Sequence, residues 1–374
     1  MMQSRAMPVK PGRIEEIGYL RGFGVLAVIA IHTTGYFTEI SEFNYLVLAN
    51  LWIDVFSQFA VPLFILISGF VLARNYPEDY SLKKFYIKRV RSIIPQYLIF
   101  SILYTAFNNW AVMQNSSFGT NVSLLLKNVW NAEASYHLWF FAIIIQFYLL
   151  FPVIMKLYNL FKQSGRAELL VVLFLIVQTL FMVGIHTFYL SGIKLNFIGF
   201  LFYFVLGVYT ADHFAPLKRG LKGQTLFLFT MSLILTIGSS FFIIIGLTTG
   251  YRFSSIPAYF LIGSELVYPV FRVITFLFLF NMAQNLIKKR KTLLAKMINR
   301  FGEYSFGIYL IHIFFNQSAI KMLRNRQIGF DDWIFYPIVL GVTLILSYLS
   351  VRLISFFPFS YYLLGSQTNK RTAK

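Results

Sequence analysis

Residues 17–38, IGYLRGFGVLAVIAIHTTGYFT, form a long apolar stretch that also holds Arg21 and His32. A bilayer-spanning helix needs about 20 mostly apolar residues, so the stretch predicts a membrane helix. Arg21 and His32 are eleven positions apart, which places them on nearly the same helix face, about 16 Å apart along the axis. Because ionisable groups inside a span are costly unless they face a cavity or a partner, we expect a polar stripe running inward from the cytoplasmic end. The alternative is that Arg21 reaches the headgroups and His32 makes a buried hydrogen bond.

The composition extends the membrane interpretation to the whole chain. Of its 374 residues, 57% are hydrophobic, 19% are aromatic and only 13% are charged, and the mean hydropathy is +0.67. Soluble domains carry about 25% charged residues, so this chain should be an integral membrane protein. A net charge of +19 would suggest nucleic acid in a soluble protein. In a membrane protein it reflects cytoplasmic loops, so we expect membrane lipids and no nucleic acid as partners.

Several chemistries have no support in the sequence. The absence of Cys excludes disulfides, thiolate metal sites and Cys nucleophiles. There is no His-Glu-x-x-His pattern, no Gly-x-Ser-x-Gly elbow, no Walker loop and no dinucleotide fingerprint. We therefore expect no metal and no permanently bound cofactor.

Apolar stretches long enough to cross a bilayer recur along the chain. They predict an all-α polytopic membrane protein, a bundle of about ten transmembrane helices in one domain. The predicted spans are 17–38, 50–73, 93–113, 138–155, 167–186, 193–212, 225–247, 266–287, 303–322 and 333–358.

The basic residues predict the orientation, because cytoplasmic loops are enriched in Lys and Arg. With the N-terminus inside, 24 of the 33 Lys and Arg residues fall in inside segments and three within spans. The six outside residues are Lys127, Lys194, Arg252, Lys321, Arg324 and Arg326. This asymmetry predicts that both termini are cytoplasmic. Residues 1–16 then form an N-terminal tail, 17–358 the membrane domain and 359–374 a C-terminal tail, and the first helix, which lacks a cleavage site, should stay attached.

A basic segment, Lys83 to Arg91, leads directly into the third span. Lys88 and Arg91 lie on one helix face, and Arg89 takes the place of Lys88 if the register shifts by one residue. Cationic groups converging at a membrane surface suit the phosphates of a nucleotide-like donor. An ordinary positive-inside loop that contacts anionic lipid is the alternative, and it suits Lys83 and Lys84 best.

Other polar residues are candidates for the acceptor side or for structural roles. Asp54 opens the second span from outside, and Pro62 with Ser68-Gly69 predicts a kinked helix there. Glu265 and Arg272, about two helical turns apart, favour a structural ion pair across the bundle. The full set is Asp54, Ser68, His137, Trp139, Glu265, Arg272, Tyr304 and His312.

Three of these residues, His137, Trp139 and His312, have equally ordinary explanations. His137 and Trp139 begin the fourth span, where Trp139 suits the aromatic belt and His137 either meets an acceptor or anchors the helix. His312 lies within the ninth span, where a structural hydrogen bond is the favoured explanation.

Taken in order, these motifs resemble membrane-bound acyltransferase family 3. The resemblance rests on Arg21 with His32, on Ser68-Gly69-Phe70, on the basic pair before Pro95, on His137-Leu138-Trp139-Phe140 and on Tyr304 to His312. It implies about ten helices and transfer of an acyl group, usually acetyl, from cytoplasmic acyl-CoA to a carbohydrate hydroxyl at the outer face. Surface polysaccharides, their lipid-linked precursors and peptidoglycan are the implied acceptors. The chain is similar to the stand-alone branch without an extracellular hydrolase-like domain, and a bacterial plasma membrane is the implied location.

The same resemblance implies roles for named residues. His32 and Arg21 correspond to the essential pair of the first helix, and Lys88 (or Arg89) with Arg91 corresponds to the acyl-CoA-binding basic pair. Lys88 stands where the family has Arg, a departure that bears on bidentate phosphate binding. His32 then acts either as a base on the acceptor hydroxyl or as a carrier of the acyl group.

Two other function classes stay open at this point. Basic and aromatic residues around a cavity also suit a transporter or flippase for a polyisoprenyl-linked sugar or exopolysaccharide, although the paired broken helices of transporters are not evident. A non-catalytic subunit of a polysaccharide synthase is the third class. The acyl group, the acceptor sugar and whether the chain forms a homodimer are also open.

Overall fold

The computed structural model describes residues 14–76, 80–188 and 196–365. All regular secondary structure in these ranges is helical, which confirms the predicted all-α class. Most of the predicted tails, and Lys194, lie outside the described residues. The elements are α1 Glu15–Thr34, η1 Gly35–Glu39, α2 Tyr45–Ser57, α3 Ala60–Asn75, α4 Leu82–Gln114, α5 Phe118–Asn131, α6 Trp139–Gln163, α7 Ala167–Thr187, η3 Phe197–Phe200, α8 Leu201–Asp212, α9 Phe214–Gly220, α10 Thr225–Thr248, η4 Phe253–Ser255, α11 Ala258–Lys288, α12 Leu293–Arg324, α13 Phe335–Ile354 and α14 Ser360–Leu364.

The predicted number of spans is too high by a strict criterion. In the described ranges, eight helical segments are long and apolar enough to cross a membrane, or nine if η3–α8 and α9, which meet at 89°, form one span. The missing segment is α12, which contains the predicted span 303–322. It is 32 residues long but carries Glu303, His312 and Asn316. Because His312 and Asn316 are buried inside the bundle, α12 does not need the apolar surface of a lipid-facing helix.

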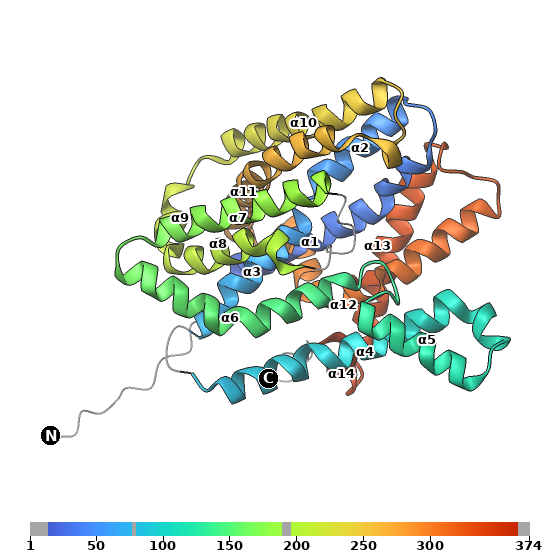
Figure 1. Cartoon of the computed structure of the whole chain (residues 1–374), viewed down its shortest axis with the longest axis horizontal. Coiled ribbons are helices and arrows are strands. Elements are labelled where there is room, and N and C mark those ends of the chain that lie inside the picture. Colours follow the sequence, from blue (N-terminus) through green and yellow to red (C-terminus); the bar gives the residue numbers. More distant parts are fainter. Residues whose placement is uncertain (1–13, 77–79, 189–195, 366–374) are drawn as a thin grey trace.

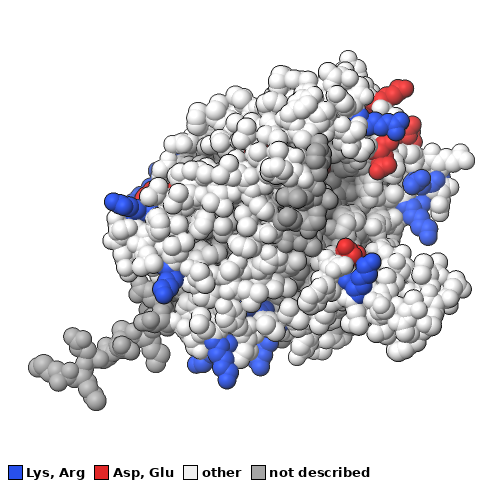
Figure 2. Space-filling model, in the orientation of Figure 1, with Lys and Arg blue, Asp and Glu red and all other residues white. Residues whose placement is uncertain are grey.

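The charged side chains leave a large part of the surface uncharged. Most long helices run along the horizontal axis of Figure 1. In the same orientation, Figure 2 shows Lys and Arg at the left and along the lower edge, both charge signs toward the right, and a largely uncharged upper and central surface. This distribution is typical of a protein whose middle lies in hydrocarbon. The multi-pass membrane prediction is confirmed at this level.

Facing glycines let α1 and α12 pack closely. A Cβ atom on Gly22 would collide with the backbone carbonyl of Ile298, and one on Gly302 with the carbonyl of Gly18. Small residues permit this kind of backbone approach between membrane helices. Arg21 and Glu303 are the immediate neighbours of Gly22 and Gly302, so the crossing brings a cation and a carboxylate to the same part of the bundle.

The second predicted span, 50–73, consists of two helices. α2 ends at Ser57 and α3 begins at Ala60, so the expected break is present and precedes Pro62. The ring of a proline clashes with the carbonyl four residues earlier, which is that of Gln58. The placement of Asp54 at the start of the span was wrong, because α2 already begins at Tyr45 and Asp54 lies near its end.

Other helix bounds differ from the predicted ones. The basic segment is itself helical, since α4 runs from Leu82 to Gln114, with non-helical backbone at Asn109. The predicted outside loop after it contains α5, which pairs with α4 through a hydrogen bond from the Asn128 amide to the Thr105 hydroxyl, 3.2 Å long. α11 begins at Ala258, eight residues before the predicted span.

Candidate active site

A cavity of about 340 Å³ lies between α1, α3, α4, α6 and α12. We call it the inner cavity, because Ser92 and Ile93, which directly follow the basic part of α4, line it. Its volume is in the range of about 300–1,000 Å³ that is usual for small-molecule sites. The lining residues that concern us are Arg21, Val28, Ser68, Ile93, Tyr148, Glu303, Ser305 and Tyr309. Val28 is one helical turn before His32, so the cavity extends from Arg21 almost to the predicted His32.

Two of the predicted site residues therefore share the inner cavity wall. Arg21 reaches it because the glycine crossing brings α1 against α12, where Glu303 also lines the cavity. Ser68 comes from α3, which is held against α8 because Gly69 packs directly on the backbone of Phe204. Arg21, Ser68 and Glu303 thus make one part of the cavity wall polar. Val28, Phe140 and Ile144 make another part apolar.

Among the basic residues Lys88, Arg89 and Arg91, it is Arg89 that reaches the wall of the inner cavity. Its guanidinium donates to the Tyr76 hydroxyl at 3.1 Å and lies over the Tyr148 ring at 5.5 Å. Tyr148 lines the inner cavity and lies within electrostatic reach of both Arg89 and Arg21. Lys88 and Arg91 are exposed beside it. The register shift considered in the sequence analysis therefore matters, since Arg89 rather than Lys88 faces inward.

Three histidines meet beyond the deep end of the inner cavity. His32 ends α1, His137 precedes α6 and His312 lies in the middle of α12. The ring centroids of His32 and His312 are 5.2 Å apart, and those of His137 and His312 are 5.3 Å apart. We call these three residues the histidine cluster. The sequence suggested each one separately, and the fold brings them together from three helices.

The hydrogen bonds leave the same nitrogen open on two of the rings. His312 Nδ1 is 2.7 Å from the Tyr309 carbonyl, and His137 Nδ1 is 3.0 Å from the Ser135 hydroxyl. Since a carbonyl can only accept, Nδ1 of His312 carries the proton and its Nε2 holds a lone pair. Nε2 of both His137 and His312 is buried and has no hydrogen-bond partner among the described residues. His137 is 1% exposed and His312 is fully buried, whereas His32 is partly exposed.

Tyr309 connects the inner cavity with the histidine cluster. It lines the cavity, its ring centroid is 5.3 Å from that of His137, and its hydroxyl donates to the His137 carbonyl. On the opposite side the edge of the Tyr136 ring meets His32, with centroids 5.0 Å apart. The Tyr136 side chain is in electrostatic contact with Tyr36 of η1. The cluster thus lies between the inner cavity and residues at the other end of the bundle.

Asp54 lies beside the end of α1 rather than in the cluster. One carboxylate oxygen accepts from the Thr34 hydroxyl at 3.4 Å and the other from the Gln58 amide at 2.9 Å. Thr34 is two residues after His32, so Asp54 fixes the end of the helix that carries this imidazole. A carboxylate held in this way positions the helix terminus next to the cluster.

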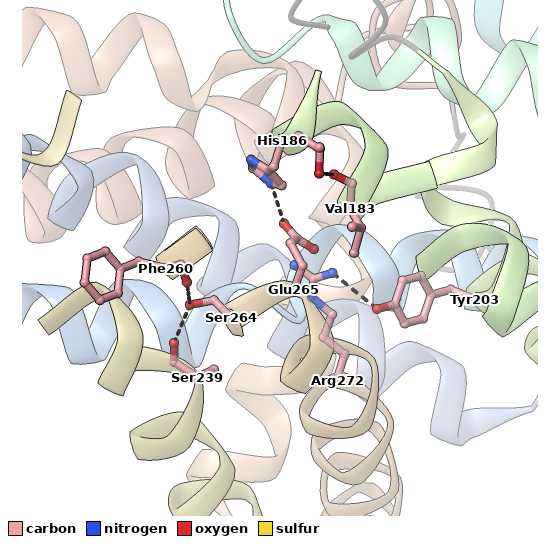
Figure 3. Close-up of polar contacts among 9 residues, drawn as sticks. Val183, His186, Tyr203, Ser239, Phe260, Ser264, Glu265 and Arg272 are labelled. Carbon is pink, nitrogen blue, oxygen red and sulfur yellow. Dashed lines mark hydrogen bonds and ion pairs between the residues drawn. The ribbon is translucent and has the colours of Figure 1, made fainter. Parts of the chain in front are cut away.

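Glu265 and Arg272 belong to a separate polar group on α11, shown in Figure 3. Glu265 contacts His186 of α7 at 3.4 Å, and the Arg272 guanidinium donates to the Tyr203 hydroxyl of α8 at 3.2 Å. Arg272 also lies over the Tyr268 ring at 4.5 Å. The predicted ion pair between Glu265 and Arg272 does not form, because each finds a partner on a neighbouring helix.

Two further candidates face away from the inner cavity. Tyr304 is buried against α13, with its ring centroid 5.7 Å from that of Tyr348. Trp139 is half-buried and stacks on Phe200 of η3, with centroids 5.9 Å apart. Both pack helices together.

Four residues of the site were not predicted from the sequence: Glu303, Tyr309, Tyr136 and Tyr148. Tyr309 stands three residues before His312 inside a quoted motif, a spacing that puts both on one helix face and could have identified it. Glu303 was taken as the edge of a span, although an acidic residue there is rare enough to notice. Tyr136 and Tyr148 carry no signal of their own in a chain with 23 Tyr.

No group of His, Asp or Glu within the described ranges is arranged to hold a metal ion. The three imidazoles of the histidine cluster can each accept or donate a proton.

The comparisons with known proteins give one match. The profile of a family described as an acyltransferase domain matches residues 14–352, which include the inner cavity walls up to α12 and the whole histidine cluster. No curated protein and no solved structure matches the chain significantly.

Proposed function

The chain belongs to acyltransferase family 3, and from this premise we propose that it transfers an acyl group from acyl-CoA to a hydroxyl of a surface polysaccharide or its lipid-linked precursor. The acyl group is acetyl in the first instance, and the acyl-CoA lies at the inner side of a bacterial plasma membrane. Membrane acyltransferase activity follows from the family and from the apolar helices. The donor, the acetyl group, the acceptor and the membrane are the proposed parts.

The observation that carries the proposal is the position of the histidine cluster. His32, His137 and His312 lie beyond the deep end of the inner cavity and are linked through Tyr136 to the opposite end of the bundle. A donor that enters from one side and an acceptor that enters from the other would meet at these rings. Imidazole is the side chain best suited to proton transfer near neutral pH.

The donor would lie with its phosphates at the mouth of the inner cavity and its thioester toward Tyr309. Arg21 and Arg89 are the guanidinium groups nearest this path, and Lys88 and Arg91 are exposed beside its mouth. Arg binds phosphate oxygens with two parallel hydrogen bonds, which favours Arg89 over Lys88 for that contact. Acyl-CoA is here a substrate and not a resident cofactor.

The reaction at the cluster is an ordinary acyl transfer. His32 takes the proton of the acceptor hydroxyl, whose oxygen attacks the thioester carbonyl. The carbon–oxygen bond of the new ester forms and the carbon–sulfur bond breaks, and the proton passes from His32 to the departing CoA thiolate. General-base assistance of this kind contributes about 10²- to 10⁴-fold. His312, in ring contact with His32, would position it.

In the relay variant, a nitrogen of His32 itself attacks the thioester. CoA leaves as the thiol with the proton of the imidazole. The acyl-imidazole then passes its acyl group to the hydroxyl oxygen, and the hydroxyl proton returns to the imidazole. The two routes can be distinguished, because only the relay leaves labelled acyl groups on the protein when no acceptor is present. Hydroxylamine releases such a label, since acyl-imidazoles are reactive acyl donors.

The experiment uses purified protein in detergent with radiolabelled acetyl-CoA, with and without candidate glycans. We expect release of CoA and transfer of label by the unchanged protein, and a loss of at least about 10²-fold in His32→Ala. His213→Ala is the matched control, because His213 stacks on Tyr209 at the bend between α8 and α9, away from the cluster.

Folded protein that neither binds nor consumes acetyl-CoA would overturn the proposal. The transporter and synthase-subunit alternatives would then return, and uptake of lipid-linked sugar into vesicles would test the first. Full activity in His32→Ala would be compatible with the proposed acyltransferase activity but would contradict the proposed role of the histidine cluster.

A further inference from the structure

A second opening lies at the other end of α12. Its volume is about 510 Å³, and it is lined by Tyr36, Gln317, Ile320, Lys321, Arg324 and Asn325. We call it the outer cleft, since it lies at the end of α12 opposite the inner cavity. Ile320 is eight residues beyond His312 on the same helix, about 12 Å along the axis. The outer cleft is therefore on the acceptor side of the proposed reaction.

The outer cleft contains two cations without an acidic partner. Lys321 and Arg324 are exposed, and no carboxylate among the described residues lies within ion-pair distance of either. The Arg324 guanidinium is instead held over the Phe330 ring at 5.4 Å. An aromatic face orients guanidinium without neutralising it, so its charge stays available to a ligand.

The next acidic residues in the sequence, Asp331 and Asp332, belong to the turn that follows α12. Asp332 accepts a hydrogen bond of 2.7 Å from the Gly329 amide, and Asp331 lies beside the same turn, within electrostatic reach of Tyr336. These carboxylates shape the turn that carries Phe330. They do not cover Lys321 or Arg324.

The position of these cations is unusual for a membrane protein. Six Lys and Arg residues fall outside in the predicted orientation, and three of them, Lys321, Arg324 and Arg326, are within six positions of one another. Outside loops are generally poor in Lys and Arg. Half of the outside cations thus gather at the end of the helix that carries His312.

Aromatic groups connect the outer cleft with the histidine cluster. Tyr36 lines the cleft and stacks on Phe330, with centroids 5.3 Å apart and ring planes 8° apart. Tyr36 is also in electrostatic contact with Tyr136, whose ring edge meets His32. Aromatic faces flanked by cations suit a sugar chain that carries negative charge.

We propose that the acceptor is an anionic glycan, whose carboxylate or phosphate group is bound by Lys321 and Arg324 in the outer cleft while one of its hydroxyls reaches His32. The inference rests on the proposed function and names its substrate class. The separation of about 12 Å between the cleft and His312 exceeds one sugar ring. The anionic group and the reacting hydroxyl therefore belong to different sugars of an extended chain.

The test measures binding of three fluorescent probes to the full chain in phosphatidylcholine nanodiscs. The probes are tetragalacturonate, its carboxyl-reduced neutral counterpart, and the neutral counterpart bearing one phosphate. We expect at least one anionic probe to bind about tenfold more tightly than the neutral one, as two ion pairs at an exposed site would give. Which anionic probe binds distinguishes carboxylate from phosphate.

The charge-removing variant Lys321→Gln with Arg324→Gln should abolish that difference. Its matched control is Lys127→Gln with Arg252→Gln, which removes two predicted outside cations elsewhere and should keep the difference. Equal binding of all three probes, no binding of any of them, or unchanged preference in the Lys321 and Arg324 variant would overturn the inference. So would loss of the preference when phosphatidylglycerol is added at constant ionic strength, since the cleft would then be a lipid headgroup site.

Binding of acetyl-CoA separates this inference from the proposed function. The Lys321 and Arg324 variant should bind acetyl-CoA as the unchanged protein does, because both residues are outside the inner cavity. Protein that binds and consumes acetyl-CoA but does not prefer anionic probes would refute only the acceptor class. Protein that does not engage acetyl-CoA at all would refute the proposed function.

Discussion

At the scale of single residues, the histidine cluster depends on backbone hydrogen bonds more than on charge. Nδ1 of His312 is bound to the Tyr309 carbonyl, and the Tyr309 hydroxyl donates to the His137 carbonyl. Tyr309 therefore fixes two of the three imidazoles at once. Its role is positioning, since its own hydroxyl is already occupied.

Tyr309→Phe should lower kcat about tenfold and leave the KM for acetyl-CoA nearly unchanged, because it removes one hydrogen bond of about 0.5–1.5 kcal/mol and keeps the ring. Steady-state transfer of radiolabelled acetyl groups measures both constants. The control is Tyr304→Phe, five residues earlier on α12, whose ring faces α13. Equal kcat values for the two variants would contradict the positioning role.

Arg89 makes a second prediction at this scale. Arg89→Gln should weaken acetyl-CoA binding about tenfold, because the guanidinium hydrogen-bonds Tyr76 and stacks on Tyr148 of the cavity wall. Calorimetric titration with a non-reactive CoA thioether provides the measurement. Lys83→Gln, an exposed cation of the same basic segment, should bind as the unchanged protein does; a matching loss there would mean that only the summed positive charge matters.

At the scale of helices, the crossing of α1 and α12 determines the site. The contact leaves no room for a side chain at Gly22 or Gly302, because each faces the backbone of the other helix. The neighbouring Arg21 and Glu303 come to the inner cavity as a result. A helix displaced here would separate the polar residues that line the cavity mouth.

Gly302→Val should destabilise the protein by about 3 kcal/mol or more, since overpacking a tight contact costs about 1–3 kcal/mol even where side chains can move. Thermal unfolding in detergent, followed by tryptophan fluorescence, would show a lower midpoint. Gly341→Val on α13 makes the same change where a Cβ would meet nothing within 4 Å. Similar midpoints for the two variants would mean that the crossing is looser than described.

The sequence predicted the helices better than their arrangement. Long apolar stretches identify α7 and α10 to within one residue, because lipid imposes length and hydrophobicity. The break before Pro62 was also predictable in kind, since proline interferes with the turn before it. α12 was harder to delimit, because a helix buried among other helices tolerates His312 and Asn316. α5 lies in a polar stretch that hydropathy assigns to a loop.

Some residues of the candidate site were predictable from the sequence, but its geometry was not. Arg21, Ser68 and His32 stand out as polar groups within apolar stretches, and the fold places two of them in the inner cavity. The meeting of His32, His137 and His312 requires three helices to be packed, and no local pattern contains that information. The predicted ion pair between Glu265 and Arg272 was wrong for the same reason. Their actual partners, His186 and Tyr203, come from other helices.

At the scale of the whole molecule, the orientation in the membrane can be tested directly. The chain has no Cys, so a single introduced Cys is the only thiol. Asn115→Cys between α4 and α5 should react with a membrane-impermeant maleimide in intact cells. Ser164→Cys between α6 and α7 should react only after permeabilisation, since basic residues flank it.

The reverse labelling pattern would mean that the protein has the opposite orientation in the membrane, with the outer cleft on the cytoplasmic side. Both positions are exposed, so lack of access from one side reports the bilayer and not burial. Labelling of both positions in intact cells, with a cytoplasmic marker protein unlabelled, would likewise contradict the predicted orientation.

The contact between α1 and α12 also has a consequence for biosynthesis. Arg21 and Glu303 are 282 positions apart. Ribosomes add about 5–20 residues per second, so roughly 15–55 s pass between the appearance of these two residues. During that time α1 is in or near the translocon without the helix against which its glycines pack. The nascent first helix must therefore be held by the insertion machinery or stay at the interface, and no truncated chain that stops before α12 can acquire activity.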